Sequence, residues 1–203
     1  MIKNIIFDFG DIFINLDKQA TYKAMAELGV TEISEEMISV YHAYEKGNIS
    51  TDEFIGFYHQ KCDINTVDLI RAWNAILLDF PKRRLAFLKA LSASKKYRLF
   101  LLSNTNELHI SHIQNNWGMD VYTEFKSCFE QFYLSHEINF RKPDATIYEF
   151  VLTENNLVAE QTLFVDDLKE NTEAAKEVGL HVWNLIPGEE DVVDLLTRKE
   201  FLV

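Results

Sequence analysis

Four short pieces of this 203-residue chain carry side chains that could together transfer a phosphoryl group. They are Asp8, the pair Ser103-Asn104, Lys142, and the pair Asp166-Asp167. An aspartate can act as a nucleophile, and an ammonium can neutralise phosphoryl oxygens. A carboxylate pair can hold a hard cation such as Mg²⁺, while a hydroxyl and main-chain amides can bind another phosphoryl oxygen. These groups are suited to moving a phosphoryl group to water.

The elements that precede these residues would bring them together. Apolar runs come directly before three of the four pieces: Ile5-Ile6-Phe7, Leu99-Phe100-Leu101-Leu102 and Leu163-Phe164-Val165. Such runs predict buried strands, and the carboxyl ends of parallel strands meet at one edge of a sheet. We therefore expect one site at that edge.

The rest of the chain predicts an α/β fold. Strand-like runs at 4–9, 98–103, 131–135, 162–166 and 181–185 alternate with helical patterns, among them 81–93, 145–155 and 171–178. This alternation is typical of βα units, so we expect a Rossmann-like core with a parallel five-stranded sheet.

The segment 17–78 breaks this rhythm. It contains no convincing strand and is predicted to form three or four helices, with breaks at Gly29, Gly47 and 62–65. Ser50 and Glu53 have the spacing of a capping box, which predicts a helix start. We expect a catalytic core made of 1–16 and 79–203, with 17–78 as a small helical domain inserted after the first strand.

These motifs resemble those of the haloacid dehalogenase-like hydrolase superfamily. The resemblance runs from residue 4 to about 186 and is carried by Asp8-Phe9-Gly10, Ser103-Asn104-Thr105-Asn106, Arg141-Lys142-Pro143, and Asp166-Asp167 with Asn171. It is strongest to the branch of bacterial glucose-1-phosphate phosphatase and the phosphatase domain of soluble epoxide hydrolase. It implies an aspartyl-phosphate on Asp8, a phosphoryl-binding Ser103-Asn104, a neutralising Lys142, and a cap formed by the helical insert.

The resemblance also implies a Mg²⁺ cofactor and its ligands. These would be the second oxygen of Asp8, the backbone carbonyl of Gly10, and one carboxylate of Asp166-Asp167. Aligning Asn171 with the family's later acidic or amide position favours Asp167 as the direct ligand. Asp166 would then orient Lys142 or hold a water of the metal.

One position departs from the family pattern. Typical phosphatases of the superfamily carry an acid–base aspartate two residues after the nucleophile, where this chain has Gly10. Such a residue contributes about a hundred- to ten-thousand-fold in rate. Asp11 lies one residue late and is expected to point elsewhere. An anomeric phosphate needs less acid help, so Gly10 favours substrates such as glucose-1-phosphate.

The leaving group of the substrate should face the cap. We select Asn106, Trp73 and Glu45 as substrate-binding residues, since amides and carboxylates bind hydroxyls and an indole can stack on a sugar face. Further candidates are Asn15, Tyr41, His42, Tyr44, Asn74 and His109.

Composition limits the partners and the location. The net charge of −12 argues against nucleic acid and anionic membranes as partners. No run approaches the roughly 20 apolar residues of a membrane helix, and nothing at the N-terminus resembles a signal peptide. Cys62 and Cys128 fit a reducing compartment, so we expect a cytoplasmic enzyme acting on a small phosphorylated substrate.

Several alternatives remain open at this point. Each piece alone also fits a turn, a helix cap or a surface charge. A phosphate-binding regulatory protein without activity would tolerate Gly10, but it would not need Asp8, Lys142 and the carboxylate pair. A haloacid dehalogenase needs no magnesium, and a phosphomutase needs the acid that Gly10 replaces. A magnesium-dependent phosphatase is the function that uses all four pieces.

Overall fold

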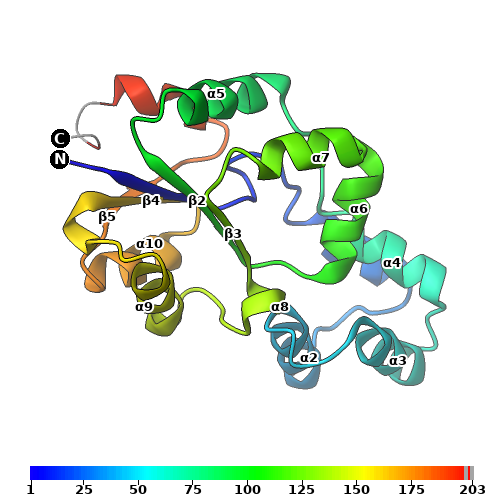
Figure 1. The fold of residues 1–203 in the computed structure, drawn as a ribbon. Coiled ribbons are helices and arrows are strands. Elements are labelled where there is room, and N and C mark those ends of the chain that lie inside the picture. Colours follow the sequence, from blue (N-terminus) through cyan, green and yellow to red (C-terminus); the bar gives the residue numbers. More distant parts are fainter. Residues whose placement is uncertain (199–200, 202–203) are drawn as a thin grey trace.

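A parallel sheet forms the centre of the molecule (Figure 1). The computed structural model describes residues 1–198 and 201, and in that part of the chain the sheet has five strands in the order β3-β2-β1-β4-β5. The strands are β1 (Asn4–Phe7), β2 (Arg98–Ser103), β3 (Gln131–Leu134), β4 (Thr162–Asp166) and β5 (His181–Asn184). The predicted α/β class and parallel sheet are confirmed.

The apolar runs form strands because both faces of the sheet are covered. Ile5, Ile6 and Phe7 of β1 have no exposed surface. Ile5 and Phe7 belong to one hydrophobic cluster and Ile6 to another, as alternating side chains require. Phe7 pairs with Leu101 on one side and Val165 on the other, so the carboxyl ends of the three central strands lie close together at one edge of the sheet.

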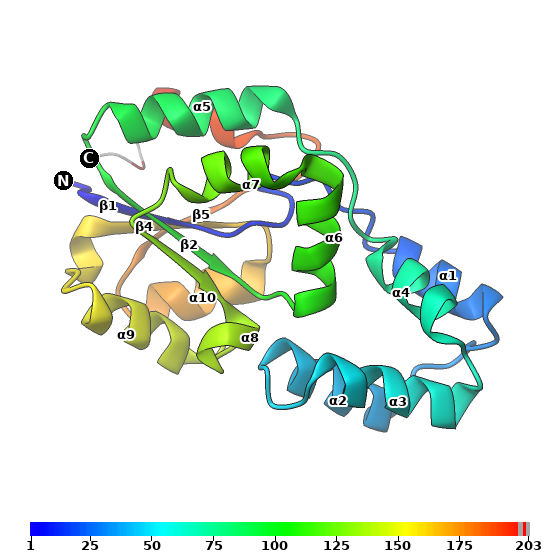
Figure 2. The same cartoon turned by 45° about the vertical axis from the view of Figure 1, so that its right-hand side comes forward.

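Helices cover the two faces of the sheet (Figures 1 and 2). On one face lie α5 (Lys82–Ala93), α6 (Glu107–Trp117) and α7 (Met119–Lys126), and on the other α9 (Ala145–Glu154) and α10 (Lys169–Glu177). Shorter elements are α8 (Ser135–Ile138), η1 (Ala159–Gln161) and η2 (Val192–Thr197). The predicted helices 81–93, 145–155 and 171–178 are present with shifts of one or two residues, whereas α6 and α7 had not been predicted.

A group of helices lies beside the carboxyl edge of the sheet (Figure 2). They are α1 (Ala20–Glu27), α2 (Glu35–Glu45), α3 (Thr51–Cys62) and α4 (Thr66–Asn74). They pack around a hydrophobic cluster of their own that includes Phe54, Leu69 and Trp73. The capping box at Ser50 is confirmed, because Ser50 Oγ accepts from the Glu53 amide and the Glu53 carboxylate accepts from the Ser50 amide.

Two connections join this group of helices to the sheet and run side by side. The Asn15 amide donates to the Asp79 carbonyl at 2.9 Å, and the Leu78 amide donates to the Asn15 carbonyl at 3.0 Å. Leu16 and Leu77 form a β-bridge between them. The predicted domain boundaries, after 16 and before 79, fall at this paired crossing and stay a prediction.

The loop that follows α2 packs directly on the backbone of α8. Gly47 has a φ of +66°, and a Cβ built there would lie 2.0 Å from the carbonyl oxygen of His136. The Asn139 side chain donates to the Lys46 carbonyl at 2.8 Å, and Lys46 forms an ion pair with Asp144. These contacts fix the end of α2 against the core.

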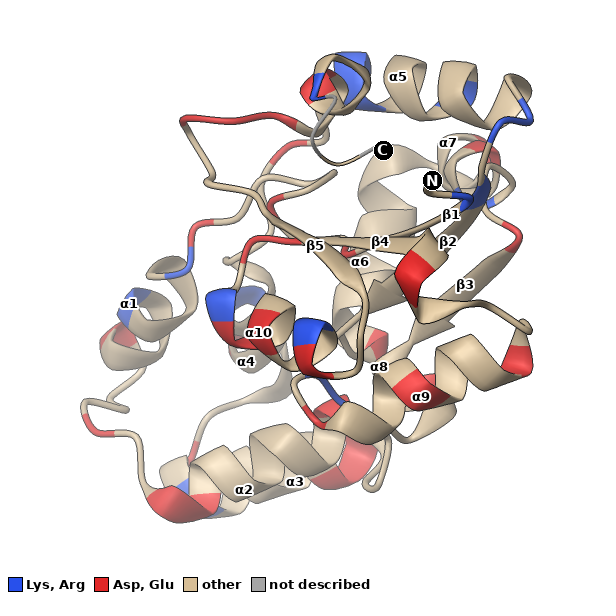
Figure 3. Cartoon of the chain, turned by 90° about the vertical axis from the view of Figure 1, so that its left-hand side faces the viewer, with Lys and Arg blue, Asp and Glu red and all other residues tan. Residues whose placement is uncertain are grey.

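Acidic side chains are distributed over several elements of the molecule. Figure 3 shows Asp and Glu on several elements, among them α2, α9 and α10. Within residues 1–198 and 201, the structure holds no helix of the length and apolarity needed to cross a bilayer. The absence of a nucleic-acid partner stays a prediction.

Charged side chains of α5 and of the segment 189–191 make specific contacts. Leu85 lies only partly buried on α5, because Arg84 takes an inward position and donates to the Phe13 carbonyl. The acidic run 189–191 leads into η2, where the Asp191 side chain caps the helix by accepting from the Val193 amide. Asp191 pairs with Arg83 and Arg84, and Glu190 accepts from the Trp183 indole.

Replacing Gly47 tests the docked loop. Gly47→Ala should lower the free energy of unfolding by about 2–4 kcal/mol, because it combines left-handed strain with an overpacked contact. The matched control is Gly29→Ala: Gly29 has a φ of +92° but no heavy atom within 4 Å of the added Cβ, so only the strain of about 1–2 kcal/mol applies. Urea unfolding gives both values, and equal losses would contradict the close packing of Gly47 on α8.

Candidate active site

The ammonium of Lys142 contacts residues at the carboxyl ends of β1, β2 and β4. Lys142 Nζ lies 2.7 Å from Asp8 Oδ1, 2.7 Å from Asp166 Oδ2 and 2.8 Å from the Leu102 carbonyl oxygen. The side chain of Lys142 is 1% exposed. Because each of its three protons has an acceptor, the ammonium holds a fixed position beside Asp8.

The charges of this cluster depend on one another. Burial works against the Lys142 ammonium, but Asp166 and Asp8 outweigh it and raise the pKa of Lys142. Burial also raises the pKa of Asp8 to about 7, and the nearby ammonium opposes that shift. Lys142 is therefore charged, and Asp8 needs neighbouring positive charge to stay ionised.

Asn104 positions the backbone of Lys142. Its side-chain Nδ2 donates to the Lys142 carbonyl, and its Oδ1 accepts from the Lys142 amide, each at 2.9 Å. The side chain of Asn104 is therefore used to hold Lys142, while Ser103 lines the cavity next to Asp8. Sequence reasoning had expected Asn104 only as a phosphoryl-binding residue.

Asp8 is held in place by an aromatic cluster beneath the following loop. Phe9 and Phe13 each lie 5.2 Å, between ring centroids, from Phe125. Arg84 also donates to the Phe13 carbonyl and to Asn15 Oδ1. Asn15, a candidate for substrate binding, is thus used to accept from Arg84 and to stabilise the loop after β1.

The carboxylates of Asp8, Asp166 and Asp167 converge at this edge. Their ligand oxygens all lie within 4.8 Å of one another. Both oxygens of Asp166 are engaged, by Lys142, by the Leu168 amide and by the Asn171 amide group. Asp167 faces the cavity and pairs with Lys18.

This arrangement fits a hard divalent cation. Burial and the neighbouring carboxylate of Asp166 raise the pKa of Asp167, while Lys18 opposes the shift, so added positive charge would stabilise the cluster. Among the described residues, the buried Oδ1 of Asn171 has no hydrogen-bond partner. An oxygen-only set of carboxylates with an unpaired amide oxygen matches the chemistry of Mg²⁺.

Neither Gly10 nor Asp11 places an acid–base carboxylate beside Asp8. A Cβ built on Gly10 would lie 2.7 Å from Leu16 Cδ1, so Leu16 occupies the space beside this residue. The Gly10 carbonyl accepts from the Ile12 amide at 2.6 Å. Asp11 turns away as expected: it accepts from the Leu16 amide and pairs with Lys18 at 3.1 Å.

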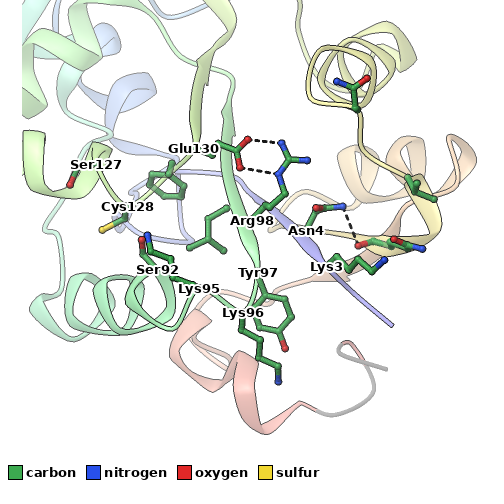
Figure 4. A pocket seen from close by; sticks show the side chains of 15 residues that line it. Lys3, Asn4, Ser92, Lys95, Lys96, Tyr97, Arg98, Ser127, Cys128 and Glu130 are labelled. Carbon is green, nitrogen blue, oxygen red and sulfur yellow. Dashed lines mark hydrogen bonds and ion pairs between the residues drawn. The ribbon is translucent and has the colours of Figure 1, made fainter.

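A cavity of about 360 Å³ opens from these groups toward the helices α1–α4. Asp8, Ser103 and Lys142 line one part of it, and Tyr41 and Glu45 line another. A larger hollow of about 680 Å³ lies at the opposite edge, lined by Lys3, Asn4 and Arg98 at or near the starts of strands (Figure 4). There Arg98 is already paired with Glu130, and none of the predicted site residues contributes.

The predicted substrate-binding residues have different positions. Glu45 lines the active-site cavity. Trp73 packs within the cluster of α1–α4 and lines a neighbouring cavity of about 160 Å³. Asn106 is fully buried and caps α6, where its Oδ1 accepts from the His109 amide at 3.1 Å. The sequence predicts that Asn106 binds the substrate. In the structure its side chain instead accepts a hydrogen bond from a backbone N–H in the first turn of α6.

Two cations of the site were missed by sequence reasoning. Lys18 bridges Asp11 and Asp167, and Arg141 pairs with Glu45. The only signal for Arg141 was its place beside Lys142, and nothing in the sequence relates Lys18 to residue 167. The Lys18–Asp167 and Arg141–Glu45 contacts join segments that are distant in the chain.

The family follows from a comparison with known proteins. A family model described as haloacid dehalogenase-like hydrolase matches residues 5–185. The chain belongs to the haloacid dehalogenase-like hydrolase family. It is 27% identical over 190 residues to D-ribitol-5-phosphate phosphatase of Bacteroides thetaiotaomicron, covering 90% of this chain and 91% of that one. This hydrolase is thus a homologue of a phosphatase of its family.

Solved structures of the family have the same fold. The magnesium complex of a family enzyme from Bacteroides thetaiotaomicron superposes with a TM-score of 0.85 at 30% identity, covering 97% of this chain and 98% of that one. A wild-type complex of that enzyme with magnesium and inorganic phosphate has a TM-score of 0.80 at 29% identity, with 94% and 97% coverage. A family hydrolase from Porphyromonas gingivalis reaches 0.86 at 26% identity, with 98% of both chains covered.

The buried imidazole of His109 should make the hydrolase sensitive to acid. Burial lowers the pKa of His109 to about 4, and its Nε2 lies 3.3 Å from the Trp73 carbonyl oxygen. The unfolded chain binds this proton more strongly, so its contribution to stability is present above about pH 6.5 and falls as the pH drops toward 4. Between pH 7.5 and 5.0 the loss from this residue should be about 2 kcal/mol.

The measurement is urea unfolding of wild type and His109→Gln at both pH values, with EDTA present. The difference between the two proteins isolates His109 from the carboxylates, whose titration is common to both. An equal pH dependence in both proteins would rule out a depressed pKa for His109.

Proposed function

We propose that this hydrolase is a magnesium-dependent phosphatase of small phosphorylated metabolites, of the sugar or polyol phosphate class, acting through an aspartyl-phosphate on Asp8. The observation that most supports it is the contact of Lys142 Nζ with Asp8 Oδ1, at 2.7 Å, in a cavity that Asp167 also lines. A nucleophile, a fixed cation and a second carboxylate then lie around one space of metabolite size.

Each residue has a separate task in the proposed reaction. One oxygen of Asp8 attacks phosphorus, so that an Asp8–phosphorus bond forms and the bond to the leaving oxygen breaks. Lys142 neutralises charge on the transferring group, and Ser103 donates its hydroxyl to a phosphoryl oxygen. Water then attacks phosphorus, releases inorganic phosphate and restores the Asp8 carboxylate.

We assign the metal to Asp8, Asp167 and the Gly10 carbonyl. Mg²⁺, when bound, supplies positive charge to the phosphoryl oxygens and keeps the carboxylates ionised. Asp167 lines the cavity and is paired with the partly exposed Lys18, whereas both oxygens of Asp166 are taken by protein donors. Asp166 therefore orients Lys142, and Asn171 orients Asp166.

The leaving group must be released without an acid at position 10. Leu16, and not an acidic side chain, lies beside Gly10. The proton for the leaving group therefore comes from water or from the substrate itself. Glucose-1-phosphate suits such a site, because its leaving oxygen is hemiacetal. The relative named for D-ribitol-5-phosphate widens the proposed class to polyol phosphates. A cytoplasmic location and the branch of glucose-1-phosphate phosphatase stay predictions.

We further propose that the helices α1–α4, within 17–78, act as a cap. Among them, α1 and α2 line the cavity on the side facing Asp8. The two hydrogen-bonded segments around 15–16 and 77–79 connect the four helices to the core. A cap in this place would exclude water and contact the leaving group. Glu45 at the end of α2 is the substrate-binding residue of the cap that its position supports best.

Phosphate release tests the proposed function. Wild type should hydrolyse p-nitrophenyl phosphate and members of a panel with glucose-1-phosphate, ribitol-5-phosphate and glycerol-3-phosphate when Mg²⁺ is present, and EDTA should abolish this. Asp8→Asn should lower kcat by at least about a thousand-fold, because the attacking oxygen is replaced. Asp120→Asn, at an exposed position of α7, is the control with full activity. Metal-independent turnover, or an active Asp8→Asn variant, would exclude this mechanism.

Variants of the paired carboxylates test the assignment of the metal ligand. Asp167→Asn should abolish Mg²⁺ binding in calorimetry and leave the melting temperature in EDTA close to wild type. Asp166→Asn should lower stability in EDTA by about 3–5 kcal/mol, because it breaks a buried ion pair. The reverse pattern would make Asp166 the ligand.

A further inference from the structure

A buried ion pair connects the proposed cap to the loop that carries Lys142. Arg141 Nε donates to Glu45 Oε2 at 2.7 Å, and the side chains are 19% and 6% exposed. Arg141 Nη1 also donates to the Lys142 carbonyl at 3.0 Å. The guanidinium is thus held between the last residue of α2 and the residue that contacts Asp8.

Tyr41 completes this group, one helical turn before Glu45. Its hydroxyl donates to Glu45 Oε1 at 2.7 Å, and the Arg141 guanidinium carbon lies 5.9 Å from the centre of its ring. Burial raises the pKa of Tyr41, so the phenol keeps its proton and remains a donor to Glu45. Both oxygens of the Glu45 carboxylate are therefore fixed by donors.

Tyr41, Glu45 and Arg141 line the same cavity as Asp8 and Lys142. A phosphate placed beside Asp8 and Lys142 would direct the rest of the substrate into this cavity. The groups available there are hydroxyl, carboxylate and guanidinium, each of which can bond to an alcohol.

The pair matters because an unpaired arginine would select a different substrate. A guanidinium binds carboxylates and phosphates strongly through two parallel hydrogen bonds. Here the Glu45 carboxylate already compensates the Arg141 charge. A second anionic group on a substrate would have to displace a buried carboxylate or lie beside it, and like charges brought together in an interface cost several kcal/mol.

We infer that Glu45, by neutralising Arg141, makes the site select phosphate esters with an uncharged, hydroxylated leaving group and reject substrates that carry a second anionic group. The inference rests on the proposed phosphatase function and narrows its substrate class. The contacts of Lys46 and Gly47 with the core keep the end of α2, and hence Glu45, at this position.

Two substrates that differ at one carbon test this selection. Glycerol-3-phosphate ends in a hydroxymethyl group where 3-phosphoglycerate ends in a carboxylate. Wild type should have a kcat/KM at least about tenfold higher for the first compound. Glu45→Gln, which keeps the shape but leaves Arg141 unpaired, should lower that ratio by about tenfold or more, mainly through a lower KM for 3-phosphoglycerate.

Matched variants separate charge from other effects. Glu36→Gln removes an exposed carboxylate from the same helix and should keep the wild-type ratio. Arg141→Gln leaves Glu45 unpaired and should raise the ratio further. The double variant Glu45→Gln with Arg141→Gln should lose the gain in 3-phosphoglycerate turnover that Glu45→Gln alone produces.

The possible outcomes distinguish this inference from the proposed function. If wild type hydrolyses no phosphate ester with Mg²⁺, the proposed function is wrong. If wild type is active without preferring glycerol-3-phosphate, or if Glu45→Gln is active with an unchanged ratio, the inference is wrong and the function stands. If Glu45→Gln does not fold, Arg141→Gln decides: a higher ratio supports the inference, and an unchanged or lower one overturns it.

Discussion

The site depends on one buried ammonium. Lys142 Nζ contacts Asp8, Asp166 and the Leu102 carbonyl, and so ties together the ends of three parallel strands. Without this cation, two buried carboxylates would face each other uncompensated, which costs several kcal/mol. The same charge keeps Asp8 beside the place where a phosphoryl group can bind. The stability of the site and its proposed chemistry therefore depend on the same three hydrogen bonds. The Asn104 side chain keeps Lys142 in position by hydrogen bonding to its backbone amide and carbonyl.

A second constraint is the distance between the helices α1–α4 and the core. Gly47 lets the loop after α2 approach the His136 carbonyl more closely than any side chain would permit. That approach brings Glu45 to Arg141, next in sequence to Lys142. The helical group and the lysine loop thus share a polar contact at the cavity. The positions of Glu45 and Lys142 are linked, because Arg141 contacts Glu45 and directly precedes Lys142 in the sequence.

The sheet was predictable because its strands are local and apolar. Ile5-Ile6-Phe7 and Leu163-Phe164-Val165 are buried on both faces, which a continuous apolar run indicates directly. The helix start at Ser50 was equally local, since a capping box lies within four residues. Helices α6 and α7 had no prediction from the sequence, although Ile110, Ile113 and Trp117 recur at helical spacing. Asn106 was assigned to the substrate because its use as the cap of α6 was not visible until that helix was known.

The sequence by itself determined the fold class, the set of reactive residue types and their place at one edge of a parallel sheet, because strand burial and motif order are properties of short segments. Only the tertiary structure decided how these residues pair. That Lys18 pairs with Asp167 and that Glu45 neutralises Arg141 depend on contacts across long stretches of chain, and the approach of Leu16 to Gly10 depends on how the loop between them folds. Such pairings follow from packing in three dimensions, where charge and volume are balanced between elements rather than within them.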